Sequence, residues 1–280
     1  MTSMRRVLTI AHLTLDEAAR RKVLLATVVC GLVFIALFGI GFYFIHRDLM
    51  RDALPMAQRR MMLTFFTMAG LYAVNFLMVM TAVLLPVDTL SGEIASGVMQ
   101  TVASKPIRRG EIVLGKWLAH GLVLAGYLLL MAGGVLLVAR AISGVTPPHV
   151  ERGMPLMLLE GVVLMTLSVA GGARLSTITN GIAVLGLYGL AFVGSWTEQI
   201  GTLAGNETAR YIGTTASLIM PSEALWQLAA WHMQPPIMRD LHLTPFSPAS
   251  VPNAAMVAWA AGYVVVTLLV GLRAFSRRSL

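Results

Sequence analysis

Apolar residues fall into long blocks along the chain, separated by short polar stretches. Six blocks of about 20 residues carry few or no charged side chains. A helix rises about 1.5 Å per residue, so about 20 apolar residues cross the ~30 Å hydrocarbon core of a bilayer. We therefore predict an all-α membrane protein, one transmembrane domain over 1–280, with six transmembrane helices at residues 23–45, 61–85, 117–139, 154–173, 177–195 and 254–272.

The first apolar stretch, residues 2–13, is too short to span and is interrupted by arginines. Such a pattern is typical of an interfacial helix, which lies on the headgroups rather than crossing the bilayer. Thr14 with Glu17 fits a capping box that would begin the next helix. We expect an N-terminal interfacial helix that ends before Thr14.

A polar interval, residues 86–116, separates the second and third predicted spans. Ile94, Val98 and Val102 recur at i, i+4 and i+8, so one apolar stripe runs along a helix. Ser91 can serve as its N-cap, and Pro106 would stop it. The spacing predicts a short amphipathic helix over 91–104. Its apolar stripe suits either the lipid headgroups or a soluble docking partner, and spacing alone leaves both readings open.

The interval between the fifth and sixth predicted spans is long and rich in proline. It holds two helical stretches, 207–219 and 222–233, broken at Pro221. Each is about 18 Å long as a helix and cannot cross the membrane alone. We predict short broken external helices over 207–233 that are re-entrant or lie in the outer leaflet, where Trp226 and Trp231 suit an interfacial position.

Composition agrees with this membrane assignment. The chain of 280 residues is 57% hydrophobic and 12% charged, with mean hydropathy +0.76, whereas soluble domains carry about 25% charged residues. The net charge of +8 does not indicate nucleic-acid binding, because the basic residues flank apolar blocks.

Lysine and arginine collect in cytosolic loops of membrane proteins. With six spans, 13 of the 21 basic residues share one side with both termini. We therefore expect both termini and the 91–104 helix to be cytosolic. The 13 residues are Arg5, Arg6, Arg20, Arg21, Lys22, Lys105, Arg108, Arg109, Lys116, Arg174, Arg273, Arg277 and Arg278.

Few residues offer chemistry inside the membrane. The chain contains no GxxxxGK[ST] phosphate loop, no HExxH and no GxSxG. Glu160 is the one ionisable residue inside a predicted span, and Asn75 is the most polar interior group of the second span. Intramembrane acids are costly and often functional, so both are candidates for a substrate path. The alternative is that Glu160 reaches the headgroups or a neighbouring loop.

Histidine and methionine gather in the external interval, and both bind copper. Ordinary interfacial packing explains the same residues in a chain with 18 Met. We therefore expect no metal site, with a weak copper alternative at His232, Met233, Met238 and His242.

The polar interval contains a spaced series of motifs: Glu93-x-x-x-Gly97, then Lys105-Pro106-Ile107-Arg108-Arg109, then Ile112-x-x-Gly115-Lys116. This series resembles the signature of ABC-2-type transporter permeases, and within them the NosY-like and sodium-exporter-like branch. Val98-Met99 stands where that family usually has Thr-Leu, which leaves the helix intact.

The resemblance implies that two copies of the chain, a homodimer, pair with two cytosolic ABC ATPase subunits in a bacterial cytoplasmic (inner) membrane. The ATPase would bind ATP and Mg, so we expect no cofactor and no enzymatic activity in this chain. The 91–104 segment would be the coupling helix seated on the ATPase. The coupling residues would be Glu93, Ile94, Gly97, Val98, Gln100, Thr101, Pro106, Arg108, Arg109 and Lys116.

Three functional classes follow from these observations. The leading one is the permease subunit of an ATP-driven exporter. The alternative is a NosY-like permease that transmits ATP-driven motion to an external, periplasmic partner protein in copper or sulfur cofactor assembly. An autonomous channel or intramembrane enzyme is disfavoured, because the sequence shows neither a catalytic set nor a series of pore charges.

Overall fold

The computed structural model describes residues 3–20, 22–52, 54–97, 108–240 and 250–278, and all regular structure within these ranges is helical. The helices are α1 (Ser3–Arg20), α2 (Lys22–Arg51), α3 (Met56–Leu84), α4 (Ser91–Ala95), α6 (Arg109–Ser143), α7 (Val150–Gly172), α8 (Thr177–Leu203), α9 (Glu207–Ile219), α10 (Ser222–Met233), α11 (Pro236–Asp240) and α12 (Ala254–Ser276).

Six helices of the described chain, α2, α3, α6, α7, α8 and α12, are long and apolar enough to cross a membrane. The prediction of an all-α protein with six transmembrane helices is confirmed. Helix α8 continues to Leu203, beyond the predicted end at Ser195, and so includes Glu198. The extension of α8 was missed because Thr197, Glu198 and Gln199 look like the start of a polar loop.

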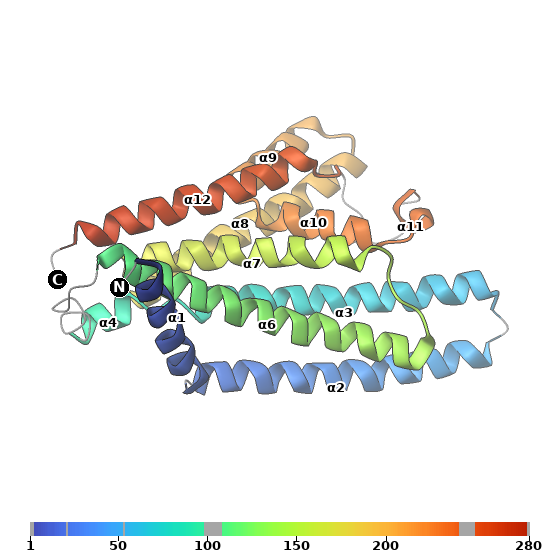
Figure 1. Cartoon of the computed structure of the whole chain (residues 1–280). Coiled ribbons are helices and arrows are strands. Elements are labelled where there is room, and N and C mark those ends of the chain that lie inside the picture. The colour runs from blue at the N-terminus through green and yellow to red at the C-terminus, as the bar shows by residue number, and fades with distance from the viewer. Residues whose placement is uncertain (1–2, 21, 53, 98–107, 241–249, 279–280) are drawn as a thin grey trace.

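Helix α7 lies at the centre of the bundle (Figure 1) and contacts α3, α6, α8, α10 and α12. Helix α2 lies at the margin, and within its described side chains only Gly31 and Phe42 are buried. A marginal helix in a bilayer meets lipid tails, so its exposed Leu, Val and Ile carry no solvation cost.

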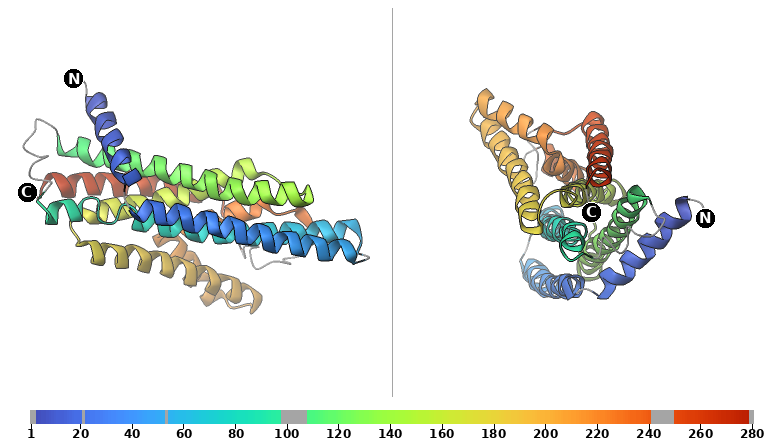
Figure 2. Two further views of the ribbon diagram at one scale, coloured as in Figure 1. Left: turned by 90° about the horizontal axis from the view of Figure 1, so that it is seen from below. Right: turned by 90° about the vertical axis from the view of Figure 1, so that its left-hand side faces the viewer.

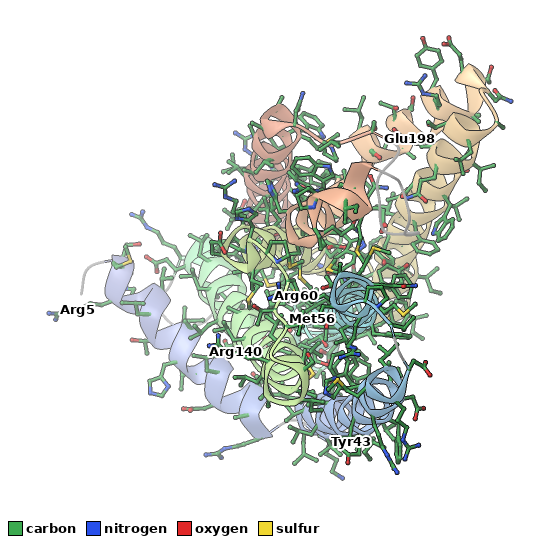
Figure 3. The ribbon with its side chains drawn as sticks, turned by 90° about the vertical axis from the view of Figure 1, so that its right-hand side faces the viewer. Arg5, Tyr43, Met56, Arg60, Arg140 and Glu198 are labelled. Carbon is green, nitrogen blue, oxygen red and sulfur yellow. The ribbon has the colours of Figure 1, made fainter. Side chains whose placement is uncertain are left out.

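The N-terminal and C-terminal residues and α4 lie at one end of the bundle, which we call the α4 end (Figure 1). Figure 3 looks onto the opposite end, where Arg60 on α3 and Arg140 on α6 lie. The chain therefore brings the polar interval after α3 to the same end as both termini.

Helix α1 crosses the α4 end obliquely (Figure 2) and packs against α6. Its buried face consists of Val7, Ala11, Thr14 and Ala18. The predicted capping box at Thr14 is wrong, because the helix continues through it to Arg20 and the Thr14 hydroxyl donates to the Ile10 carbonyl at 2.9 Å. The protein surface of α6, rather than lipid alone, receives the apolar face of α1.

Helices α9 and α10 begin and end at the residues where the sequence placed the two broken stretches. Helix α9 packs along α8, whereas α10 packs against α7 inside the bundle. Residues 221–230 are buried throughout, and Trp226 is 2% exposed, with its ring 5.4 Å from that of Tyr72. The interfacial position expected for Trp226 is wrong, since this side chain is part of the core.

Candidate functional site

The α3–α6 connector, residues 85–108, leaves α3 in a series of tight turns; its residues 98–107 lie outside the described chain. Pro86 has no backbone N–H to donate to a carbonyl of the preceding turn, so it favours the end of α3. The Thr89 N–H donates to the Pro86 carbonyl at 3.0 Å, and the Gly92 N–H donates to the Asp88 carbonyl at 2.8 Å. These bonds lead directly into α4, so the connector is held by its own backbone up to Ala95.

Helix α4 ends after five residues, and Gly97 adopts φ +75°. A residue in this left-handed region ends an α-helix, and glycine adopts it without steric cost. The predicted continuous helix over 91–104 is therefore interrupted at Gly97. Ser91 is the first residue of α4 rather than its N-cap, which is Leu90.

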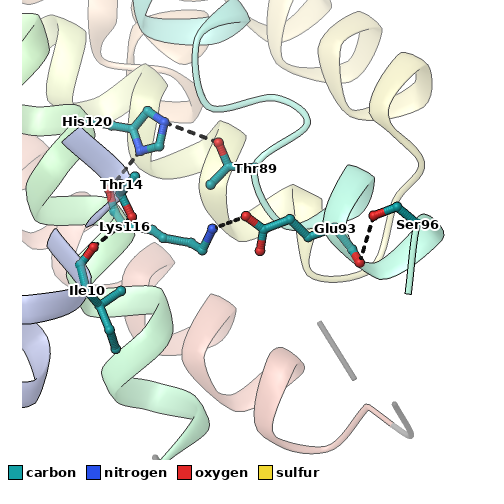
Figure 4. Close-up of polar contacts among 7 residues, drawn as sticks. All are labelled: Ile10, Thr14, Thr89, Glu93, Ser96, Lys116 and His120. Carbon is teal, nitrogen blue, oxygen red and sulfur yellow. Dashed lines mark hydrogen bonds and ion pairs between the residues drawn. The ribbon is translucent and has the colours of Figure 1, made fainter. Parts of the chain in front are cut away.

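Two polar contacts join the connector to α6 (Figure 4). Lys116 Nζ donates to Glu93 Oε1 in an ion pair whose side chains are 7% and 16% exposed. His120 Nδ1 lies 2.7 Å from the Lys116 carbonyl oxygen, which can only accept, so Nδ1 carries the proton. In the neutral ring, Nε2 then accepts from the Thr89 hydroxyl at 3.1 Å. Successive turns of α6 thus bind two turns of the connector.

A second set of contacts joins the connector to α8. The Ser91 hydroxyl donates to the Val87 carbonyl at 3.1 Å and accepts from the Thr177 hydroxyl at 2.8 Å. Asn180 Nδ2 lies 2.7 Å from the Ser168 carbonyl of α7 and 3.4 Å from the Val87 carbonyl. The connector is consequently linked by side-chain hydrogen bonds to α8, a transmembrane helix that is not adjacent to it in sequence.

Apolar packing reinforces these polar links. A cluster of Leu90, Ile112, Val113, Val169, Ala173 and Phe275 fills the α4 end, and Ile94 packs against it. Burying a side chain of this size contributes about 1.5–3 kcal/mol. Ile94, the large apolar side chain of α4, therefore packs against other helices of the same chain.

The α1 helix supports α6 directly behind Lys116. A Cβ atom added at Gly115 would lie 2.7 Å from Ile10 Cβ and 2.9 Å from the Val7 carbonyl oxygen, so only glycine permits this approach. Arg6 of α1 also lies 3.6 Å from the Glu111 carboxylate in the first turn of α6. Gly115 and Lys116 therefore face two neighbours, α1 on one side and α4 on the other.

The C-terminal residues close the α4 end. Arg278 Nη1 donates to the Ala173 carbonyl, in the turn between α7 and α8, at 2.6 Å. Arg109 Nη1 donates to the carbonyl of Arg278 and, at 3.4 Å, to that of Ser276. The first turn of α6, the end of α12 and the α7–α8 turn are thereby tied together.

A second polar region lies inside the bundle. Glu160 on α7 is 1% exposed and accepts from Asn75 Nδ2 on α3 at 3.2 Å. Glu223 on α10 is 4% exposed. The Oε2 atoms of both carboxyls and Oδ1 of Asn75 are buried without a hydrogen-bond partner among the described residues. The structure thus brings together Asn75 and Glu160, both predicted from sequence, and adds Glu223.

A family model described as "ABC-2 family transporter protein" matches residues 8–280. The chain belongs to the ABC-2 family of transporter proteins. It is a multi-pass membrane protein, an ABC-2 permease.

Two proteins named probable ABC transporter permease protein NosY are similar to parts of this permease. The one from Pseudomonas aeruginosa is 35% identical over 111 residues, which cover 36% of this chain and 39% of that protein. The one from Stutzerimonas stutzeri is 39% identical over 72 residues, which cover 25% of this chain and 26% of that protein. The chain therefore matches less than half of the length of either relative.

Several predicted coupling residues occupy positions other than those expected. Glu93 was placed on the polar, outward face of an amphipathic helix, but it turns inward to Lys116, and Ile94 packs on the permease itself. Arg108 is exposed, whereas Arg109 is half-buried against the C-terminal residues. Ala95 and Ser96 are the exposed positions of the described connector before Gly97. Val98, Gln100, Thr101 and Pro106 lie outside the described residues.

The four residues considered for copper do not share one open site in the described chain. Met233 is fully buried and packs against Gly153, and Met238 is 2% exposed. His232 packs edge-on against Trp231, with ring centroids 5.3 Å apart. His242 lies outside the described residues.

Sequence reasoning missed the residues that join the connector to α8, and it missed Glu223. A signal for Asn180 was present, since it is an amide near the start of an apolar block. Glu223 had no comparable signal, because an acid in the first turn of a 12-residue helix is usually a solvated helix-dipole partner.

Proposed function

We propose that this permease receives mechanical force from a cytosolic ABC ATPase through the α3–α6 connector and passes it to α6 and α8. The ATPase would bind ATP and Mg, two copies of each subunit would assemble, and substrate export would follow ATP turnover. The α4 end would be cytosolic, because 13 of the 21 basic residues fall on that side in the sequence.

The observation that carries this proposal is the double attachment of the connector. Glu93 and Thr89 bond to α6, while Ser91 and the Val87 carbonyl bond to α8. A segment attached at both places cannot move without moving two transmembrane helices. A surface helix lying on lipid headgroups would have no need of such contacts.

Docking and transmission are assigned to different residues of the connector. The exposed positions Ala95 and Ser96 would contact the ATPase, whereas the inward-facing Glu93 would hold the connector to α6. Glu93→Arg would therefore disturb the permease itself and cannot test docking. Ala95 offers the cleaner position, since a substitution there leaves the described contacts intact.

Co-purification in mild detergent tests docking. We expect Ala95→Arg to reduce the recovered ABC ATPase by about tenfold or more, as for a residue central to an interface. Ala204→Arg, at an exposed turn between α8 and α9, is the matched control and should recover as much ATPase as the wild type. Equal recovery with Ala95→Arg would place the ATPase elsewhere.

A second candidate function rests on the similarity to two permeases named NosY. In this version the same ATP-driven motion would act on an external, periplasmic protein in copper or sulfur cofactor assembly rather than on an exported substrate. Co-purification of an external protein that is lost on altering the α9–α12 region would favour this function over export.

A further inference from the structure

A pocket of about 240 Å³ lies between α3, α8 and α10. Three aromatic side chains, Tyr72, Trp196 and Trp226, line it together with the carboxyl of Glu223. Trp196 is 42% exposed, whereas Trp226 and Glu223 are 2% and 4% exposed. The pocket therefore has an open end at Trp196 and a buried end that holds the acid.

Glu223 has no counter-charge in the described chain. Its Oε2 atom is buried without a hydrogen-bond partner, and no Lys, Arg or His of the described residues forms an ion pair with it. An ionised carboxylate buried in this way costs several kcal/mol. Glu223 must therefore hold either a proton or a bound cation.

The surroundings of Glu223 add negative charge rather than relieve it. The titratable side chains that interact with it are Glu160 on α7, Tyr72 on α3 and Tyr188 on α8. Glu160 is itself buried, and it is bonded only to the neutral amide of Asn75 in the described chain. A second acid near Glu223 therefore opposes its ionisation instead of neutralising it, so a cation that displaces the proton from Glu223 would find no competing positive side chain among the described residues.

We propose that this pocket binds a small organic ammonium ion, with its charge at Glu223 and its alkyl groups against the rings of Tyr72 and Trp226. The faces of Trp and Tyr attract cations, and these two ring centroids lie 5.4 Å apart beside the acid. Drug-sized ligands occupy about 300–1,000 Å³, so a pocket of 240 Å³ selects a smaller ion.

This inference names a substrate class for the proposed function and rests on it only for transport. Binding itself needs the permease alone, without ATPase or ATP. A failure of ammonium binding leaves the docking result with Ala95→Arg untouched, and a failure of docking leaves the pocket intact. The two proposals can therefore fail separately.

Calorimetry on the full chain in detergent tests the pocket with tetramethylammonium chloride as probe. We expect saturable binding by the wild type and no binding of tert-butanol, a neutral molecule of similar shape. Glu223→Gln keeps the side-chain volume and removes the charge, and should weaken binding by at least about tenfold. Glu207→Gln, an exposed acid in the first turn of α9, is the matched control and should bind as the wild type does.

The pH dependence of tetramethylammonium affinity shows whether Glu223 acts through its charge or through its packing. Burial raises the pKa of Glu223 to about 8, so at lower pH the ammonium ion must displace a proton. Tetramethylammonium affinity should rise with pH up to about 8 in the wild type and stay flat in Glu223→Gln.

Three results would overturn the proposal. Tetramethylammonium could bind Glu223→Gln as tightly as it binds the wild type, or tert-butanol could bind the wild type as tightly as tetramethylammonium does. In the third, a titration of the wild type with sodium chloride would give the same calorimetric response as the titration with tetramethylammonium chloride. Removing a buried charge should not unfold the permease, so the Glu223→Gln melting temperature should match or exceed that of the wild type. The comparison of tetramethylammonium with tert-butanol on the wild type decides the matter even if the variant does not fold.

Discussion

Glu93 and Glu223 lie in two regions of this permease, and their carboxyl groups have opposite electrostatic surroundings. Glu93, at the α4 end, is paired with Lys116, and both side chains are largely buried. Glu223, inside the bundle, faces aromatic rings and a second acid and has no cation among the described residues. A paired charge fixes its element in one place, whereas an unpaired charge remains available to a proton or a ligand.

The difference separates two tasks of a transport subunit. The connector must move α6 and α8 as one unit, so its charges are neutralised within the chain. A site that exchanges a cation must instead leave its acid without a cationic partner in the protein, so that a proton alone neutralises it when the site is empty. The predictions below test whether the two glutamates differ in this way, in order of the expected size of the effect.

The largest effect should follow from Lys116→Met. This change leaves Glu93 without its partner in a mostly buried position, and we expect a loss of about 3–5 kcal/mol in the free energy of unfolding. The double variant Glu93→Leu, Lys116→Met should recover most of that loss, because it removes both charges. Unfolding of the three proteins in detergent would measure both changes; a single variant as stable as the wild type would show that the pair does not anchor the connector.

The second effect is a pH dependence of stability that originates at Glu223. Its folded pKa, raised by burial to about 8, exceeds the ordinary value of 4.5. The folded state therefore binds more protons between these values, so stability should fall as pH rises from 5 to 8, by at most about 1.4 kcal/mol per pH unit. Melting temperatures measured across this range should decline in the wild type, and the decline should be smaller in Glu223→Gln.

The smallest effect on stability should come from Glu160→Gln. The glutamine oxygen can still accept from Asn75, and a buried charge disappears. We expect a change within about 1 kcal/mol, with expression unchanged and transport reduced. Transport in proteoliposomes at the wild-type rate would return Glu160 to a structural role. Glu93→Gln offers the contrast, since it leaves Lys116 unpaired and should destabilise the protein.

The spans were predictable from the sequence because membrane insertion depends on residue type and length over some 20 positions. The ends of α9 and α10 were equally readable, since Pro221 interrupts the helix and Asn206 provides an N-cap that accepts from the Ala209 N–H at 3.1 Å. Local rules suffice where one residue decides the boundary.

Directions of side chains were not predictable in the same way. The i, i+4 spacing of Ile94 and Val98 indicated one continuous helix, but Gly97 turns the backbone out of the helical region. Glu93 was expected to face a partner because it lies opposite the apolar stripe. Within the chain its ion-pair partner is Lys116, 23 residues away in sequence, so only the packing of α6 against the connector brings the two together.

For α10, the sequence left open whether the helix is re-entrant or lies in the outer leaflet. Two tryptophans in a short helix are typical of a membrane interface, and nothing local shows that α7 lies beside them. Once α10 is inside the bundle, Trp226 becomes a core residue and Glu223 becomes a buried acid. Whether such a helix is interfacial or enclosed depends on long-range contacts. The pocket exists because α10 is enclosed.

The bond from Arg278 to the Ala173 carbonyl has a practical consequence for anyone who isolates this protein. An affinity tag placed shortly after Arg278 would lie next to the residue that clamps the α7–α8 turn, close to where the connector is anchored. Immobilising the molecule by that tail would pull on the turn during every assay of motion. A tag inserted between α2 and α3, at the opposite end, would leave the clamp undisturbed.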